Sequence, residues 1–144
     1  MKLKFTKIIA LYVFSCFLSA NILALEITIT TPTTQLEMSV DSQKFDNLDY
    51  LHLPTILLKL DIQVSFYDTK IKMIKDNIQV EIDLLSTTFA VTESNATKLL
   101  QLSHPLKVHN DTVWIEFNDL RNLMQEVFKY QITSKELNLN QDVN

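Results

Sequence analysis

Three histidines, His52, His104 and His109, are the residues of this sequence best suited to metal binding or acid–base chemistry. No two of them form an H-x-H pair, and His104 and His109 lack the helical spacing of an H-E-x-x-H site. Acidic pairs such as Asp61 and Asp68 lie near predicted turns, where solvated carboxylates are far commoner than catalytic pairs. We therefore expect no metal site, no cofactor and no catalytic residue.

Nucleophilic catalysis has equally little support. Cys16 is the single cysteine, and the sequence contains no glycine, whereas about 7% is usual. P-loops, dinucleotide-binding fingerprints and G-x-S-x-G elbows all need glycine, so these classes are excluded. The sequence predicts a non-enzymatic protein, and a small secreted hydrolase is kept as an unlikely alternative.

Two short aromatic segments are the best candidates for binding. In Tyr50-Leu51-His52-Leu53 and Trp114-Ile115-Glu116-Phe117, alternate side chains point to opposite faces of a strand. If Tyr50, His52, Trp114 and Glu116 lie on an exposed sheet face, they suit glycan stacking or a protein contact. The alternative is that the two aromatic rings cover a second, minor core under loops.

These segments belong to an internal repeat. Residues 50–60 align with residues 114–124 at an offset of 64, and residues 62–73 align with residues 128–139 at an offset of 66. Each copy reads as strand, helix, strand, turn and strand. The predicted fold is α+β: a duplicated strand-helix-strand-strand unit, with an antiparallel sheet curled against two short helices.

Alternating apolar residues predict the strands, and turn residues separate them. The polar run 41–47 is expected to be a turn. Pro54 is expected to begin the first helix, and Asn118 is expected to be the N-cap of the second. A strand is expected to include Phe128. Because glycine is absent, left-handed turn positions must use Asn or Asp, and the candidate turns are Asp46-Asn47, Asp76-Asn77, Ser94-Asn95 and Asn110-Asp111.

The first 24 residues have the layout of a secretory signal peptide. Three lysines precede an apolar segment, and Ala20 and Ala24 are plausible cleavage positions. An uncleaved membrane anchor is the main alternative, and Cys16 resembles the cysteine of a lipobox. We expect an extracytoplasmic protein that meets a membrane only through an uncleaved signal or a lipidated Cys16. Residues 140–144 are expected to form a flexible tail.

Charge excludes another class of partner. Residues 25–144 keep 10 of the 13 basic side chains and all 17 acidic ones, so their formal net charge is −7. Nucleic-acid binding requires clustered Lys and Arg that displace counterions from phosphates. We therefore expect no nucleic-acid partner.

The repeat resembles the copper amine oxidase-like N-terminal domain of bacterial envelope proteins. Ser86 to Val91 stands at that family's small-residue segment between the repeats, His104-Pro105 at its proline, and Asn110-Asp111 at its Asn-Gly turn. The resemblance covers residues 27–139, and we expect one such domain over residues 25–139. The family's glycines are missing, and Leu51-His52-Leu53 and Ile115-Glu116-Phe117 replace its Val-Pro-Leu segments.

The resemblance implies a non-catalytic module that binds or scaffolds in the cell envelope, with an envelope protein or a wall polymer as its partner. A periplasmic chaperone or inhibitor, which would add a partner strand to a sheet edge, is the alternative.

Overall fold

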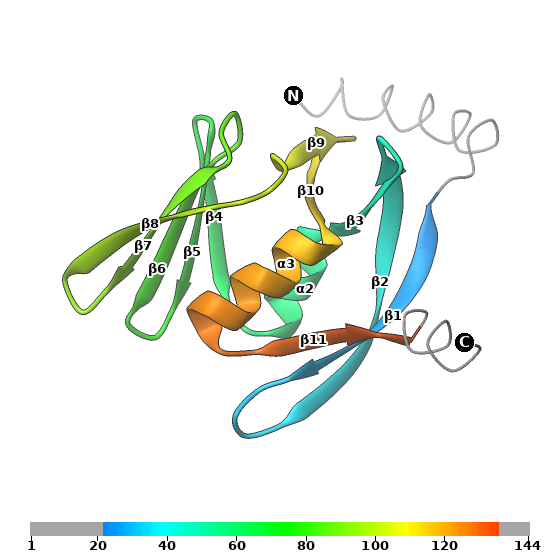
Figure 1. The fold of residues 1–144 in the computed structure, drawn as a ribbon, viewed down its shortest axis with the longest axis horizontal. Coiled ribbons are helices and arrows are strands. Elements are labelled where there is room, and N and C mark those ends of the chain that lie inside the picture. The colour runs from blue at the N-terminus through cyan, green and yellow to red at the C-terminus, as the bar shows by residue number, and fades with distance from the viewer. Residues whose placement is uncertain (1–21, 136–144) are drawn as a thin grey trace, which may run out of the picture.

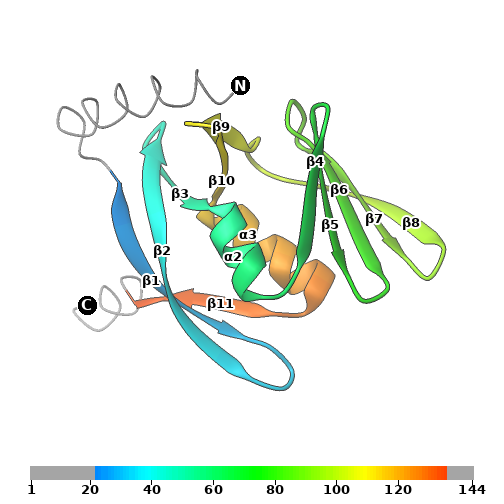
Figure 2. The same cartoon turned by 180° about the vertical axis from the view of Figure 1, so that it is seen from behind.

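The computed structural model describes residues 22–135, and residues 1–21 and 136–144 lie outside the described part. Two antiparallel sheets flank two short helical segments (Figures 1 and 2). The α+β class is therefore confirmed in its coarse form. The expected signal peptide and C-terminal tail lie almost wholly outside the described residues, as do Leu137 and Leu139, the last strand expected in the second repeat.

The first sheet has the strand order β11-β1-β2-β3-β10-β9. Its strands are β1 (Leu23–Thr30), β2 (Gln35–Phe45), β3 (Leu48–His52), β9 (Lys107–His109), β10 (Thr112–Glu116) and β11 (Gln131–Ser134). Strand β2 is long and changes partners along its length. It pairs with β1 as far as Ser42 and with β3 from Ser42 to Phe45.

That change of partner corrects one prediction. The polar run 41–47 was expected to be a turn, but β2 continues to Phe45 and only Asp46 and Asn47 form the turn. Polar side chains are compatible with a strand here because Asp41 and Lys44 of β2 are exposed. Backbone pairing with β3, rather than side-chain burial, keeps this stretch extended.

The second sheet is a meander in the order β4-β5-β6-β7-β8. Its strands are β4 (Gln63–Tyr67), β5 (Lys70–Lys75), β6 (Ile78–Asp83), β7 (Thr88–Glu93) and β8 (Ala96–Gln101). Every neighbouring pair is antiparallel, as the sequence alternation predicts. Strands β4 and β8 are the two edges.

The glycine-free turns use Asn, Asp and Ser in the left-handed region. Both residues of Asp46-Asn47, Ser94-Asn95 and Asn110-Asp111 have positive φ, and so does Asp76 of Asp76-Asn77. The four predicted turn positions are therefore confirmed. Asn and Asp tolerate this conformation better than other non-glycine residues, because their short polar side chains can bond locally.

Helix α2 (Leu53–Lys59) begins at the predicted place, with Pro54 in its first turn. Helix α3 (Phe117–Leu123) continues into η1 (Met124–Phe128), and Lys129 ends the segment with φ 62° and ψ 33°. The predicted N-cap of α3 was wrong. Glu116, not Asn118, caps this helix, because its carboxylate accepts the Asp119 backbone N–H.

The helical continuation corrects a second prediction. Phe128 was expected in a strand, but it ends η1, and the strand starts only at Gln131. Phe128 is nevertheless buried, and its ring stacks on Tyr130 at 5.9 Å between centroids. Apolar alternation over three residues did not distinguish a strand from the end of a helix.

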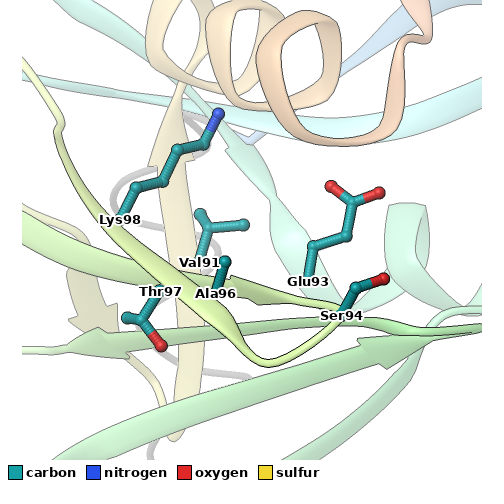
Figure 3. A pocket seen from close by; sticks show the side chains of 6 residues that line it. All are labelled: Val91, Glu93, Ser94, Ala96, Thr97 and Lys98. Atoms are coloured by element: carbon teal, nitrogen blue, oxygen red, sulfur yellow. The ribbon is translucent and has the colours of Figure 1, made fainter.

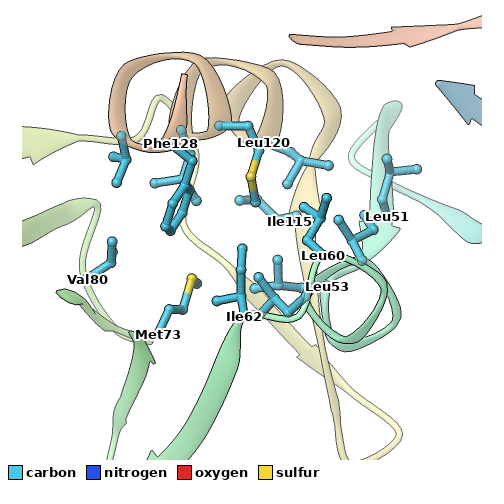
Figure 4. Packing of buried hydrophobic residues seen from close by; sticks show 14 of the residues in the cluster. Leu51, Leu53, Leu60, Ile62, Met73, Val80, Ile115, Leu120 and Phe128 are labelled. Atoms are coloured by element: carbon cyan, nitrogen blue, oxygen red, sulfur yellow. The ribbon is translucent and has the colours of Figure 1, made fainter. Parts of the chain in front are cut away.

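One hydrophobic core joins the two sheets and the helical segments. Figure 4 shows Leu53 and Leu60 around α2, and Leu120 and Phe128 on the second helical segment, directed toward the same interior as Met73 of β5. Burial of this apolar surface is the main force that holds the two sheets together. None of the helices in residues 22–135 has the length and hydrophobicity that a membrane crossing requires.

Candidate functional site

Strands β3 and β10 bring the four predicted binding residues together. The two strands pair so that Tyr50 lies opposite Glu116, Leu51 opposite Ile115, and His52 opposite Trp114. This register puts Tyr50, His52, Trp114 and Glu116 on one face of the sheet, as the alternation of the two segments predicts.

That face is covered rather than exposed. The residues Tyr50, Trp114 and Glu116 retain only 2%, 3% and 3% of their accessible surface, and His52 is half-buried. The expectation of an exposed aromatic face was therefore wrong, and the alternative, a second minor core, describes these rings. Buried rings of this kind cannot stack on a glycan in this conformation.

The segment 102–109, between β8 and β10, provides the cover. The Tyr50 hydroxyl donates to the Pro105 carbonyl at 3.4 Å, and Trp114 Nε1 donates to the His109 carbonyl at 3.3 Å. Burial, and then the negative charges of Glu116 and Asp119, raise the pKa of Tyr50 above its ordinary value. Tyr50 is thus a neutral hydroxyl donor that ties the covering segment to β3.

Phe45 and His109 complete this aromatic cluster. The Phe45 ring meets Tyr50 edge-on at 5.2 Å, Trp114 at 6.3 Å and His109 at 5.5 Å. Edge-to-face pairs of this spacing stabilise beyond their area burial. The cluster accordingly has a structural explanation: it packs the far side of the β3–β10 pair.

His52 is held by two threonines. Its Nδ1 lies 2.6 Å from Thr55 Oγ1 and its Nε2 lies 2.7 Å from Thr112 Oγ1, which joins β3, α2 and β10. Burial lowers the pKa of His52 below its ordinary value, although the charge of Asp41 opposes the shift. A neutral imidazole with one donor and one acceptor nitrogen suits two hydroxyl partners.

Two buried carboxylates, Glu116 and Asp119, organise the start of α3. Glu116 accepts the backbone N–H of Asp119 at 2.9 Å and the side-chain amide of Asn118 at 3.2 Å. Asp119 accepts the backbone N–H groups of Ser103 at 2.8 Å and His104 at 2.9 Å. The second carboxylate therefore anchors the covering segment to the helix.

His104 approaches both carboxylates. Its Nδ1 lies 3.5 Å from Asp119 Oδ2 and 4.0 Å from Glu116 Oε2. The Nδ1 atom is buried and has no hydrogen-bond partner among the described residues, whereas the side chain as a whole is 40% exposed. One ligand atom from each of the three residues lies within 4.8 Å of the others.

Sequence reasoning missed this cluster. The spacing of His104 to His109 does not fit a metal site, and the strand pattern predicts an exposed Glu116, so neither pattern points to Asp119. A usable signal was present: an acid three residues before another acid at a helix start resembles a capping pair. The approach of the His104-Pro105 segment is a long-range contact that no local pattern reveals.

A separate pocket of about 320 Å³ lies at the β7–β8 turn. Its lining includes Val91, Glu93 and Lys98, and Figure 3 shows the two charged side chains extending on the same side of the hairpin. The pocket is open to solvent and lined largely by one hairpin. It offers one charge of each sign but no enclosed polar group.

Within residues 22–135 the exposed Phe and Tyr side chains lie elsewhere, on edge strand β4. Phe66 is 53% exposed and Tyr67 is 43% exposed, on opposite faces of the strand. The Tyr67 hydroxyl donates a hydrogen bond to Glu81, and Lys70 Nζ lies 3.3 Å from Glu81 Oε1. These two contacts lower the pKa of Glu81 below its ordinary value. Phe66 shares its face with the buried Ile71 and extends that apolar row to the sheet edge.

Comparison of the chain with protein-family models, with curated proteins and with solved structures gives no match.

Proposed function

We propose that this chain is a non-catalytic binding module of the cell envelope, exported by its N-terminal segment, and that it binds a partner polypeptide along edge strand β4. The observation that carries the proposal is the pair of exposed aromatic residues, Phe66 and Tyr67, on that edge. Aromatic side chains with both an apolar body and an accessible face are the residues most often enriched at protein contacts.

The backbone of β4 adds to this argument. Within the described part of the chain, β4 pairs with β5 alone, so one side of the strand has no strand partner. Tyr67 and Lys70 flank the two-residue β4–β5 turn and form a hydrogen-bonded pair. Hydrogen-bonded and non-hydrogen-bonded pairs alternate along an antiparallel ladder. Val64 and Phe66 therefore direct their N–H and C=O groups away from β5. An extended peptide can bond to such groups, while Phe66 supplies a side-chain contact.

The envelope assignment rests on the resemblance to the copper amine oxidase-like N-terminal domain. The β3–β10 register supports the duplication that the resemblance implies. Leu51 and Ile115, which are equivalent at the offset of 64, lie opposite each other. Tyr50 faces Glu116 and Trp114 faces His52, so exchanging the two copies leaves the pairing unchanged. Two copies related by a local two-fold axis would pair in this way.

The binding test uses the purified chain and two envelope preparations, one with proteins and one of peptidoglycan alone. We expect saturable co-sedimentation with the protein-containing preparation, and at least tenfold weaker binding for Phe66→Ala. Leu99→Ala is the matched control, because Leu99 is 71% exposed on the opposite edge strand of the same sheet. Equal binding by both variants would contradict the β4 site.

Binding to peptidoglycan alone would favour a wall polymer over a polypeptide. Strand addition has its own test, Val64→Pro. Proline removes one outward N–H while leaving the bonds to β5 at its neighbours, and edge strands tolerate it. Lost binding with an unchanged circular dichroism spectrum supports strand addition, and retained binding would limit the contact to side chains.

A further inference from the structure

We propose that His104, Glu116 and Asp119 form a binding site for one divalent transition-metal ion, with Zn²⁺ as the representative. The three side chains come from the covering segment, the end of β10 and the first turn of α3. An ion held by them would fasten these three elements to one another.

The first argument is charge. Glu116 and Asp119 each retain only 3% of their surface, and no lysine or arginine of residues 22–135 forms an ion pair with either. Buried charged groups are costly unless they are paired with an opposite charge or coordinate a metal ion. The hydrogen bonds from backbone N–H groups offset part of this cost and supply no net charge.

The second argument is the imidazole. Nδ1 of His104 is a buried nitrogen atom without a hydrogen-bond partner, and it lies between the two carboxylates rather than toward solvent. Buried polar atoms in folded proteins are nearly always partnered. A metal ion that accepts the Nδ1 lone pair would satisfy this atom and would also offset the negative charge of both acids.

The third argument is spacing. Ligand atoms around a tetrahedral Zn²⁺ stand about 3.3 Å apart when each lies about 2.0–2.1 Å from the ion. Nδ1 of His104 is 3.5 Å from Asp119 Oδ2 and 4.0 Å from Glu116 Oε2, so small side-chain rotations bring all three to an ion. Each carboxylate oxygen already accepts one N–H and has a second lone pair available.

The ligand types select the metal. One imidazole nitrogen with two carboxylate oxygens suits Zn²⁺ and related first-row ions, whereas Ca²⁺ and Mg²⁺ prefer oxygen ligands only. Three protein ligands leave a fourth position for water.

The test is calorimetric titration of the metal-free chain with Zn²⁺, and titration with Co²⁺ followed by its visible absorption. We expect one site per chain, a raised Tm with Zn²⁺, and a Co²⁺ spectrum of a four-coordinate ion. His104→Gln should weaken Zn²⁺ binding at least tenfold. His109→Gln is the matched control, because His109 is exposed and is not one of the three proposed metal ligands.

Three outcomes would overturn the proposal. Absence of binding at millimolar Zn²⁺ is the first. Equal weakening by the two histidine variants would reduce the binding to adventitious surface contacts. The third is a metal-independent result, in which Zn²⁺ leaves the Tm of the parent chain unchanged while His104→Gln still lowers it. That result would limit His104 to a structural contact with the two carboxylates.

Discussion

Leu51 of β3 lies directly opposite Ile115 of β10, and neither side chain retains any accessible surface. This pair stands at the centre of the strand ribbon that carries both helices, since α2 follows β3 and α3 follows β10 without a loop. The pairing of these two strands, which are distant in sequence, therefore fixes where both helices begin.

The first prediction concerns this pair. Leu51→Ala and Ile115→Ala should each lower the free energy of unfolding by about 2–5 kcal/mol, because each removes buried methyl groups and leaves a cavity. Because the residues are in contact, the double variant should depart from additivity by at least about 0.5 kcal/mol. Urea denaturation measures these values. Leu99→Ala, at an exposed position, should stay within about 0.5 kcal/mol of the parent chain.

Asp119→Asn is the second prediction. Asp119 accepts two backbone N–H groups of the covering segment, one on each carboxylate oxygen. An amide can accept only one of them and presents its NH₂ group to the other, so we expect a loss of about 2 kcal/mol in unfolding free energy. The measurement is chemical denaturation with a chelator present. Glu37→Gln, which changes an exposed acid of β2, should alter the unfolding free energy little. An equal loss in both variants would contradict the structural role of Asp119.

Local signals predicted much of this fold, and long-range contacts account for most of what they missed. Alternation and Asn or Asp turns located the hairpins of the second sheet, and Pro54 located the start of α2. The exposure of Tyr50 and Trp114 could not be read from alternation, because a strand pattern defines two faces without saying what covers the second. Segment 102–109 covers that face, and its position depends on Asp119, sixteen residues after Ser103.

Cap geometry explains the other misses. Asn118 is a favourable N-cap by type, but Glu116 lies three residues before Asp119 and accepts its N–H, so the helix begins two residues earlier than an Asn118 cap requires. The same carboxylate then approaches His104, a residue from a distant loop. Of the three residues in the candidate metal cluster, only the two acids at the helix start could therefore be predicted as neighbours from the sequence.

The third prediction uses the strained residue at the end of η1. Lys129 has φ 62°, a left-handed conformation that costs a residue with a Cβ atom about 1 kcal/mol. Lys129→Gly should raise the unfolding free energy by about 0.5–1 kcal/mol, even though it removes the exposed bond from Lys129 Nζ to the Glu126 carbonyl. Lys98→Gly, within strand β8, should instead lower the unfolding free energy. A destabilised Lys129→Gly chain would show that the bond to Glu126 outweighs the backbone strain.

The last prediction concerns pH and His52. Burial lowers the folded-state pKa of His52 below its unfolded value of about 6.5, so the unfolded chain binds the proton more readily. The stability contributed by neutral His52 is therefore fully present above about pH 6.5 and is lost as the pH falls through the lower, folded pKa. Tm measured from pH 8 to pH 5 in chelator should fall more steeply for the parent chain than for His52→Gln.

His109→Gln controls for the loss of a histidine that is exposed, and its Tm profile should follow that of the parent chain. Parallel profiles for the parent and His52→Gln would mean that Thr55 and Thr112 hold the charged ring as well as the neutral one, and that His52 does not couple folding to pH.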